Sequence, residues 1–142
     1  MTSRTVLLVE DNPHDELLML RALRKANAPA DIDVVRDGQQ AVDYLFRSGE
    51  FSDRPKGLPA LVLLDINLPK LSGLDVLQRL RSEPHTKLLP VVMFTSSDED
   101  RDRLHSYRCG ANSFVNKPLE FADFTTWAKR LSAYWLGLNI AP

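Results

Sequence analysis

The sequence contains only one cysteine, Cys109, among 142 residues. A single thiol can form neither an internal disulfide nor a cysteine-based metal cage, so a reducing compartment is expected. The longest apolar runs, such as Ala60–Leu64, fall far short of the roughly 20 residues that a membrane-spanning helix needs. The N-terminal residues also lack the apolar segment of a secretory signal peptide. We therefore expect a cytoplasmic protein with no membrane partner.

An excess of charge of either sign is also missing. The 18 Lys and Arg residues nearly balance the 19 Asp and Glu residues, which gives a formal net charge of −1 at pH 7. This balance provides no global basic field, so no nucleic-acid partner is expected. Hydrophobic residues make up 44% of the chain and charged residues 26%, as in ordinary globular proteins. The length suits one domain over residues 1–142, with no second domain.

Short apolar runs alternate along the chain with longer amphipathic stretches. The runs are typical of strands buried on both faces of a parallel sheet: Val6–Val9, Ile32–Val35, Ala60–Leu64, Pro90–Phe94 and Ser113–Val115. The amphipathic stretches predict helices over residues 13–27, 38–48, 73–82, 98–109 and 121–138. Five strands alternating with five helices predict an α/β domain with a mostly parallel sheet. Residues 49–59, rich in Gly, Pro and charge, are predicted to form a long loop.

The last two predicted helices differ in their apolar content. The stretch over residues 98–109 is mostly charged, with Leu104 and Tyr107 as its expected apolar contacts. Trp127 and Tyr134 in the final stretch lie seven residues apart, and are expected either to pack partly against neighbouring chain or to anchor an interface. The remaining apolar residues of that stretch recur every three or four positions and predict one buried face: Phe121, Phe124, Ala128, Leu131, Trp135 and Leu138.

Polar side chains follow four of the five predicted strands. Because the carboxyl ends of parallel strands meet at one edge of the sheet, we expect these side chains to converge there. Three carboxylates within a few ångström of one another repel, and a hard divalent cation such as Mg²⁺ relieves that repulsion. The sequence therefore predicts a magnesium site at this edge, with a lysine opposite the metal. The residues concerned are Glu10, Asp11, Asp65, Asn67, Thr95, Ser96, Ser97 and Lys117.

This residue set predicts phosphoryl transfer onto a carboxylate. Asp65 lies centrally enough to be the nucleophile that forms an acyl phosphate. Phosphoryl transfer passes through a loose transition state whose charge lies on the equatorial oxygens. Mg²⁺ and Lys117 would stabilise that charge, and the Thr95 hydroxyl could hydrogen-bond the anion.

In this order and spacing, Glu10-Asp11, Asp65, Thr95-Ser96 and Lys117-Pro118 resemble the receiver domain of bacterial two-component response regulators. The likeness spans nearly the whole chain. It implies a flavodoxin-like (CheY-like) fold, a five-stranded parallel sheet of order 2-1-3-4-5 with five helices on both faces. Only 25 residues follow Lys117, enough for one helix, so we expect a stand-alone receiver without an output domain. The resemblance implies that it catalyses only its own phosphorylation and dephosphorylation.

The resemblance implies a role for each matching residue. Asp65 accepts the phosphoryl group from a sensor histidine kinase. Asp11 binds Mg²⁺ directly and Glu10 binds it through water, while Asp65 and the backbone carbonyl of Asn67 complete the protein ligands. The residues implied to surround the phosphoryl group are Asn67, Thr95, Ser96 and Lys117.

The resemblance also implies a switch. Thr95 and Phe114 form the switch pair, in which the hydroxyl moves toward the phosphoryl group and the ring turns inward. Phe114 replaces the tyrosine that is frequent at this position in the family. Asn67 and Ser97 occupy the positions that tune the rate of dephosphorylation.

Three segments resemble more narrowly the stand-alone regulators that partner bacterial phytochromes: Gly49–Phe51, Leu63–Lys70 and Ser132–Leu136. The implied partner is then a phytochrome-type histidine kinase. We further hypothesise a homodimer formed through residues 98–109, 113–115 and 121–138, with Trp127 and Tyr134 on its face.

Two other classes of protein fit the sequence less well. A phosphohydrolase with an aspartyl nucleophile would need a second carboxylate two residues after Asp65, where Asn67 stands. A flavodoxin-like nucleotide carrier would need a Gly- or Ser/Thr-rich loop after the first strand, where the acidic segment Glu10–Glu16 stands. Within the switch class, three modes of action stay open: direct protein contact, an intermediate phosphate carrier in a phosphorelay, or a pseudo-receiver that acts as a binding module.

Overall fold

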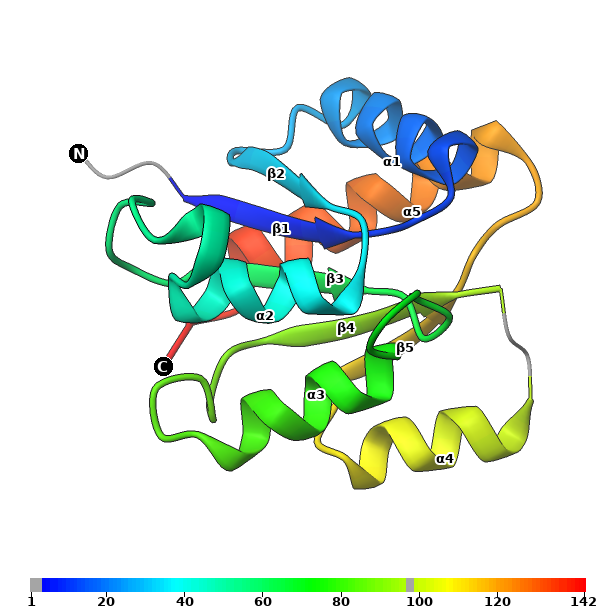
Figure 1. The fold of residues 1–142 in the computed structure, drawn as a ribbon. Helices are drawn as coiled ribbons and strands as arrows, with labels where there is room; N and C mark the ends of the chain where they lie inside the picture. Colours follow the sequence, from blue (N-terminus) through cyan, green and yellow to red (C-terminus); the bar gives the residue numbers. More distant parts are fainter. Residues whose placement is uncertain (1–3, 97–98) are drawn as a thin grey trace.

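The computed structural model describes residues 4–96 and 99–142. Its five strands pair in parallel in the order β2-β1-β3-β4-β5, which confirms the predicted sheet (Figure 1). The strands are β1 (Thr5–Val9), β2 (Asp31–Val35), β3 (Leu61–Leu64), β4 (Val91–Thr95) and β5 (Ser113–Asn116).

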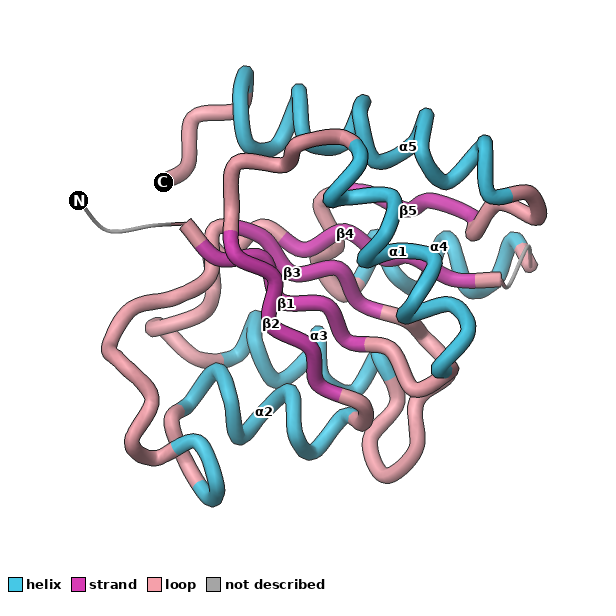
Figure 2. The backbone as a smooth tube through the Cα atoms, turned by 90° about the horizontal axis from the view of Figure 1, so that it is seen from above, coloured by secondary structure: helices cyan, strands magenta, loops and turns pink. Residues whose placement is uncertain are grey.

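Helices cover both faces of the sheet. On one side lie α1 and α5, and on the other lie α2, α3 and α4 (Figures 1 and 2). The helices are α1 (Pro13–Lys25), α2 (Gly38–Phe46), α3 (Gly73–Ser82), α4 (Asp100–Arg108) and α5 (Phe121–Ala133), with the short 3₁₀ turn η1 (Gly49–Phe51) inside the predicted loop and the π-helical turn η2 (Tyr134–Leu138) after α5. Over residues 4–96 and 99–142, none of the helices combines the length and the hydropathy that crossing a lipid bilayer would take.

The continuous apolar runs are explained by two hydrophobic cores, one on each face. Successive strand residues point to opposite faces, so each run supplies both cores. In β1, Val6 and Leu8 pack in the core beneath α1 and α5, while Leu7 and Val9 pack in the core beneath α2 and α3. The edge strand β5 is only half-buried, which accounts for its weaker hydrophobic run.

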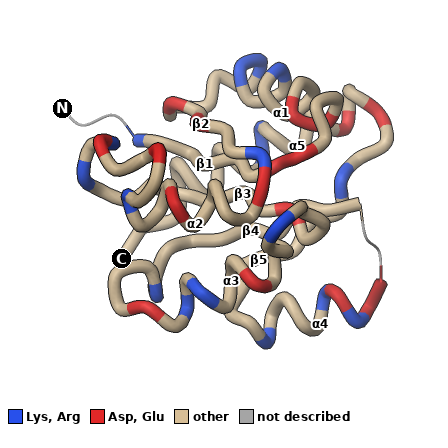
Figure 3. The backbone as a smooth tube through the Cα atoms, viewed as in Figure 1, with Lys and Arg blue, Asp and Glu red and all other residues tan. Residues whose placement is uncertain are grey.

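Helix α4 packs differently from the sequence expectation. Leu104 and Tyr107 are 52% and 49% exposed, so the prediction that they are its main apolar contacts is wrong. The buried residue of this highly charged helix (Figure 3) is Ser106, whose hydroxyl donates to the carbonyl oxygen of Asp102 at 2.7 Å. A small side chain with a satisfied hydroxyl can face the sheet at little cost, and the two larger residues then point outward.

The C-terminal helix departs from the predicted periodicity in its last turn. Phe124, Ala128 and Leu131 are buried as predicted, but the ends of the stripe are not: Phe121 is 37% and Leu138 is 76% exposed. The α-helix ends at Ala133, and the backbone NH of Asn139 donates to the carbonyl of Tyr134 five residues earlier, at 2.6 Å. This wider π turn changes which side chains face the sheet, so Leu136 is buried instead of Leu138.

Gly73, at the start of α3, allows the helix to approach the end of β3. A Cβ atom there would overlap the carbonyl oxygen of Asp65 and lie 2.8 Å from the Cα atom of Ile66. We predict that Gly73→Ala lowers the free energy of unfolding by about 1–3 kcal/mol or more, because backbone atoms must shift. Urea denaturation measures the loss.

The matched control is Gly137→Ala in η2, where the nearest atom to an added Cβ is the Ser132 carbonyl oxygen at 3.9 Å. This variant should remain within about 1 kcal/mol of the wild type. Equal stability of the two variants would show that the close approach at Gly73 does not constrain the fold.

Candidate functional site

The carboxyl edge of the sheet brings together polar side chains from separate strands. Glu10 directly follows β1 and Asp65 directly follows β3. Their backbone amides continue the sheet hydrogen bonding: Glu10 donates to the Val35 carbonyl at 3.0 Å, and Asp65 donates to the Val9 carbonyl at 3.3 Å. The backbone of the site is therefore held by the same ladder that forms the sheet.

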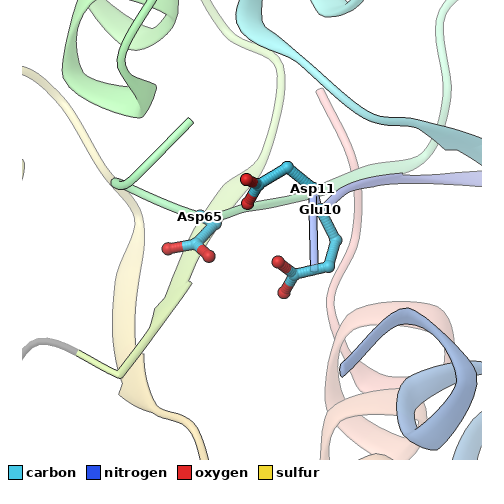
Figure 4. A group of neighbouring side chains, drawn as sticks. All are labelled: Glu10, Asp11 and Asp65. Carbon is cyan, nitrogen blue, oxygen red and sulfur yellow. The ribbon is translucent and has the colours of Figure 1, made fainter. Parts of the chain in front are cut away.

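Three carboxylates gather at this edge (Figure 4). One oxygen from each of Glu10, Asp11 and Asp65 lies within 4.8 Å of the other two. Asp11 is exposed to solvent, whereas Glu10 is only 1% exposed and Asp65 only 5% exposed. Like charges at this separation repel strongly, and the effect is larger where water is excluded.

Lys117 supplies the cation that faces these carboxylates. Its Nζ atom lies 2.6 Å from Glu10 Oε1 and donates to Asp65 Oδ2 at 2.8 Å and to Asp15 Oδ2 at 2.9 Å. Its side chain is 7% exposed, so it is a buried and fixed charge. Burial alone would lower the pKa of Lys117, but the contacts with Asp65, Glu10 and Asp15 outweigh burial and raise it. The ammonium therefore remains charged.

For the carboxyl group of Glu10, the effect of burial on the pKa outweighs the effect of the ion pair with Lys117. Burial raises the pKa of its carboxyl from the usual 4.5 to about 7, and the charge of Asp65 adds to this, while Lys117 opposes it. Its Oε2 atom accepts a hydrogen bond from the Asn12 amide at 3.2 Å. Its buried Oε1 atom is paired with Lys117 Nζ at 2.6 Å and has no other partner among the described residues.

These donors fit a hard divalent cation. Mg²⁺ and Mn²⁺ prefer carboxylate, carbonyl and water oxygens, and the site offers three carboxylates from three residues. Glu10 Oε1 retains acceptor capacity that a metal-bound water could use. The charges agree as well, since one ammonium faces more carboxylates than it can neutralise.

Asp15 is a member of this site that the sequence analysis missed. Asn12 caps α1, its side-chain oxygen accepting from the amides of His14 at 2.9 Å and Asp15 at 3.1 Å. The first turn of α1 therefore begins at the site, where Asp15 is close enough to contact Lys117. An acidic residue in the first turn of a helix ordinarily complements the helix dipole, so no sequence signal distinguishes this one.

The other predicted site residues lie around the same edge. Thr95 is fully buried at the end of β4, and its carbonyl accepts from the Lys117 amide at 2.8 Å. Ser96 is exposed just beyond it. Asn67 is also exposed, and its amide donates to Asp65 Oδ1 at 3.2 Å. Ser97 lies outside the described residues.

Three aromatic residues singled out in the sequence occupy different environments. Phe114 in β5 is half-buried against the core beneath α2 and α3. Trp127 is half-buried in the opposite core, with its ring centroid 4.6 Å from that of Phe94. Tyr134 is 50% exposed and packs edge-on against Trp135. The sequence left two alternatives for Trp127 and Tyr134: Trp127 shows the partial packing against neighbouring chain, and Tyr134 is the exposed residue of the two.

Comparison with known proteins identifies the family. The family model of the response regulator receiver domain matches residues 6–129, so this chain belongs to the response regulator receiver family. The chain is 39% identical over 137 residues to the probable methanogenesis regulatory protein FilR2 of Methanothrix harundinacea, a match that covers 96% of this chain and 86% of that protein.

Two solved structures are similar along almost the whole chain. The phosphorylated cyanobacterial phytochrome response regulator RcpA superposes with a TM-score of 0.91 at 34% identity and 99% coverage of both chains. The Mn²⁺-bound form of Rcp1, a response regulator of Synechocystis, gives a TM-score of 0.89 at 32% identity, with 98% of this chain and 99% of that one covered. The resemblance to receivers, and to phytochrome-associated regulators in particular, is confirmed.

The buried ion pairs of Lys117 predict a pH-dependent loss of stability when this residue is replaced. In chelator-treated buffer, Lys117→Met removes the cation that the buried carboxyls of Glu10 and Asp65 share, at a cost of about 3–5 kcal/mol where both carboxyls are ionised. The folded-state pKa of Glu10 already lies above its unfolded value, so its stabilising contribution is complete below pH 4.5 and is lost as the pH rises through about 7. Without Lys117 that pKa rises further, and the deficit should grow between pH 5 and pH 8.

Lys70→Met is the control, because it removes the same charge from an ion pair with Asp37 whose lysine is 67% exposed. The cost there should be about 0–1 kcal/mol at either pH. Thermal and urea unfolding of the two variants give the comparison. A deficit for Lys117→Met that does not change with pH would contradict the assigned electrostatics.

Proposed function

We propose that this receiver accepts a phosphoryl group on Asp65 from a sensor histidine kinase and transmits the signal by protein–protein contact. The observation that carries the proposal is the position of the Asp65 carboxylate. It is buried at the carboxyl edge of the sheet, with Oδ2 held by Lys117 at 2.8 Å and Oδ1 by the Asn67 amide at 3.2 Å. A nucleophile fixed on both oxygens is oriented before its reaction partner arrives.

In the proposed transfer, an oxygen of Asp65 attacks the phosphorus atom of a phosphohistidine. An O–P bond forms while the P–N bond breaks, and the electron pair of that bond stays on the imidazole nitrogen, which then takes up a proton. Negative charge collects on the equatorial phosphoryl oxygens in the transition state. Lys117 lies within hydrogen-bond distance of the attacking carboxylate of Asp65 and would stabilise that charge. The protein catalyses no reaction beyond its own phosphorylation and dephosphorylation.

Mg²⁺ is the proposed cofactor. Asp11, Asp65 and the backbone carbonyl of Asn67 would hold it directly, and Glu10 through a water molecule. The carboxylate cluster supports this assignment, as does the Mn²⁺-bound form reported for Rcp1. When bound, the ion would offset the negative charge of the site and of the incoming phosphoryl group.

The proposed switch couples the site to β4 and β5. Thr95, Ser96 and Asn67 would hydrogen-bond the phosphoryl oxygens together with Lys117, and Phe114 would respond to movement of Thr95. The hydrogen bond from the Lys117 amide to the Thr95 carbonyl supports this coupling, since it fixes the two strand ends to each other. Asn67 and Ser97 are the proposed determinants of the dephosphorylation rate.

For partners, we propose a cytoplasmic kinase of the phytochrome type, because RcpA is a phytochrome response regulator and resembles this chain over nearly its full length. A downstream protein or a phosphotransfer partner would then receive the signal. A homodimer through α4, β5 and α5 is also proposed, with Tyr134 and Trp127 at its face. Leu104 and Tyr107 of α4 support this surface, since both are about half exposed.

Phosphorylation of Asp65 can be tested by intact mass after incubation with acetyl phosphate and Mg²⁺. We expect one phosphoryl adduct on the wild-type protein and none on Asp65→Asn, because an amide cannot form the acyl phosphate. Adding a chelator should abolish the adduct as well. Asp53→Asn, at an exposed loop position, should be phosphorylated like the wild type.

Stoichiometric labelling of Asp65→Asn would place the acceptor elsewhere, and labelling in the presence of chelator would contradict the metal assignment. If the wild-type protein takes up no phosphoryl group under any condition, the chain is a pseudo-receiver that acts only by binding.

A further inference from the structure

Lys117 is held by one more carboxylate than the proposed chemistry requires. Of its three acidic contacts, Asp65 is the proposed acceptor and Glu10 belongs to the proposed metal site. Asp15 is neither, yet its Oδ2 atom accepts a hydrogen bond from Lys117 Nζ at 2.9 Å. The two residues come from opposite ends of the chain, one from α1 and one from the segment after β5.

Asp15 is well placed to act as a fixed anchor. It sits in the first turn of α1, where its backbone amide is bound by the Asn12 side chain at 3.1 Å. Its side chain is 23% exposed, so the contact with Lys117 is partly shielded from water. Asp15 is held in place by the helix, whereas Asp65 must change its own bonding in the reaction.

The contacts of Lys117 change in strength when Asp65 reacts. Bonding to phosphorus removes the negative charge of the Asp65 carboxylate, which weakens the hydrogen bond from Lys117 to Oδ2, and the charged phosphoryl oxygens then offer stronger acceptors. Glu10 would also contact the proposed metal-bound water. Asp15 alone among the three carboxylates has no other proposed role, so its contact can persist before and after transfer.

We propose that Asp15 is a positioning residue that keeps the ammonium group of Lys117 directed at the phosphoryl group. The inference rests on the proposed function of Asp65. The alternative that the test must exclude is repulsion of the phosphoryl group by the negative charge of Asp15, in which case removing that charge would speed the reaction.

Two substitutions at the same position separate anchoring from repulsion. Asp15→Asn removes the charge but keeps an oxygen that can accept from Lys117, whereas Asp15→Ala removes both. We expect Asp15→Ala to slow phosphorylation by acetyl phosphate by about 10- to 100-fold, since misplacing a catalytic group by about 1 Å can cost that much. Asp15→Asn should remain within about threefold of the wild-type rate, as an acceptor oxygen is retained.

Glu16→Gln is the matched control. It removes a carboxylate from the neighbouring position of the same helical turn, but Glu16 pairs with Arg36 at 2.9 Å instead of with Lys117. Its phosphorylation rate should equal that of the wild type.

A merely structural role of Asp15 would also slow the phosphorylation of Asp15→Ala. Three further quantities are therefore measured for each variant: the affinity for beryllofluoride in the presence of Mg²⁺, the affinity for Mg²⁺ alone, and the melting temperature. Only the beryllofluoride affinity should fall for Asp15→Ala.

Equal rates for Asp15→Ala and the wild type would overturn the inference, as would faster phosphorylation of either variant. Slowing of Asp15→Asn to the rate of Asp15→Ala would also overturn it, because charge and not position would then be the cause. A parallel loss of Mg²⁺ affinity or of melting temperature would assign Asp15 to the metal site or to the fold. If the wild-type protein itself is not phosphorylated, the proposed function fails; if it is phosphorylated and the variants do not differ from it, only this inference fails.

Discussion

The buried ammonium of Lys117 is the interaction on which the site depends. A lysine that is 7% exposed is costly unless carboxylates surround it, and three of them do. The sheet order makes this arrangement possible, because β1 and β3 are neighbours and β5 follows β4 at the edge. Chain segments more than 100 residues apart therefore both contact the ammonium group of Lys117. The need to surround this buried ammonium with carboxylates constrains both the fold and the proposed chemistry.

The same arrangement leaves a charge imbalance that shapes the proposed chemistry. One ammonium cannot neutralise the carboxylates of Glu10, Asp15 and Asp65, and Asp11 lies beside them. Part of the repulsion is relieved by protonation, as the raised pKa of Glu10 indicates. A divalent cation would relieve it more completely and would leave Glu10 ionised. The proposed metal would therefore be held in part by the same residues that fix the lysine, Glu10 and Asp65.

Most of the fold could be predicted from the sequence, because runs buried on both faces and the spacing of apolar residues report directly on burial. The acidic pair, Asp65 and Lys117 could be predicted to converge because each follows a strand. The exposed position of Leu104 in α4 and the π turn after Ala133 could not be predicted. Both depend on tertiary packing that helical periodicity does not encode. Asp15 was missed for a related reason: its partner lies 102 residues away, and its position in a first helical turn has an ordinary local explanation.

A crystal structure of the protein with Mg²⁺ and beryllofluoride, which imitates a phosphoryl group on a carboxylate, would test the role of Lys117 most directly. We predict a beryllium adduct on Asp65, with Lys117 bound to a fluorine atom and still bound to Asp15. An adduct on another residue, or a Lys117 side chain turned away from the adduct, would contradict the roles proposed for Asp65 and Lys117.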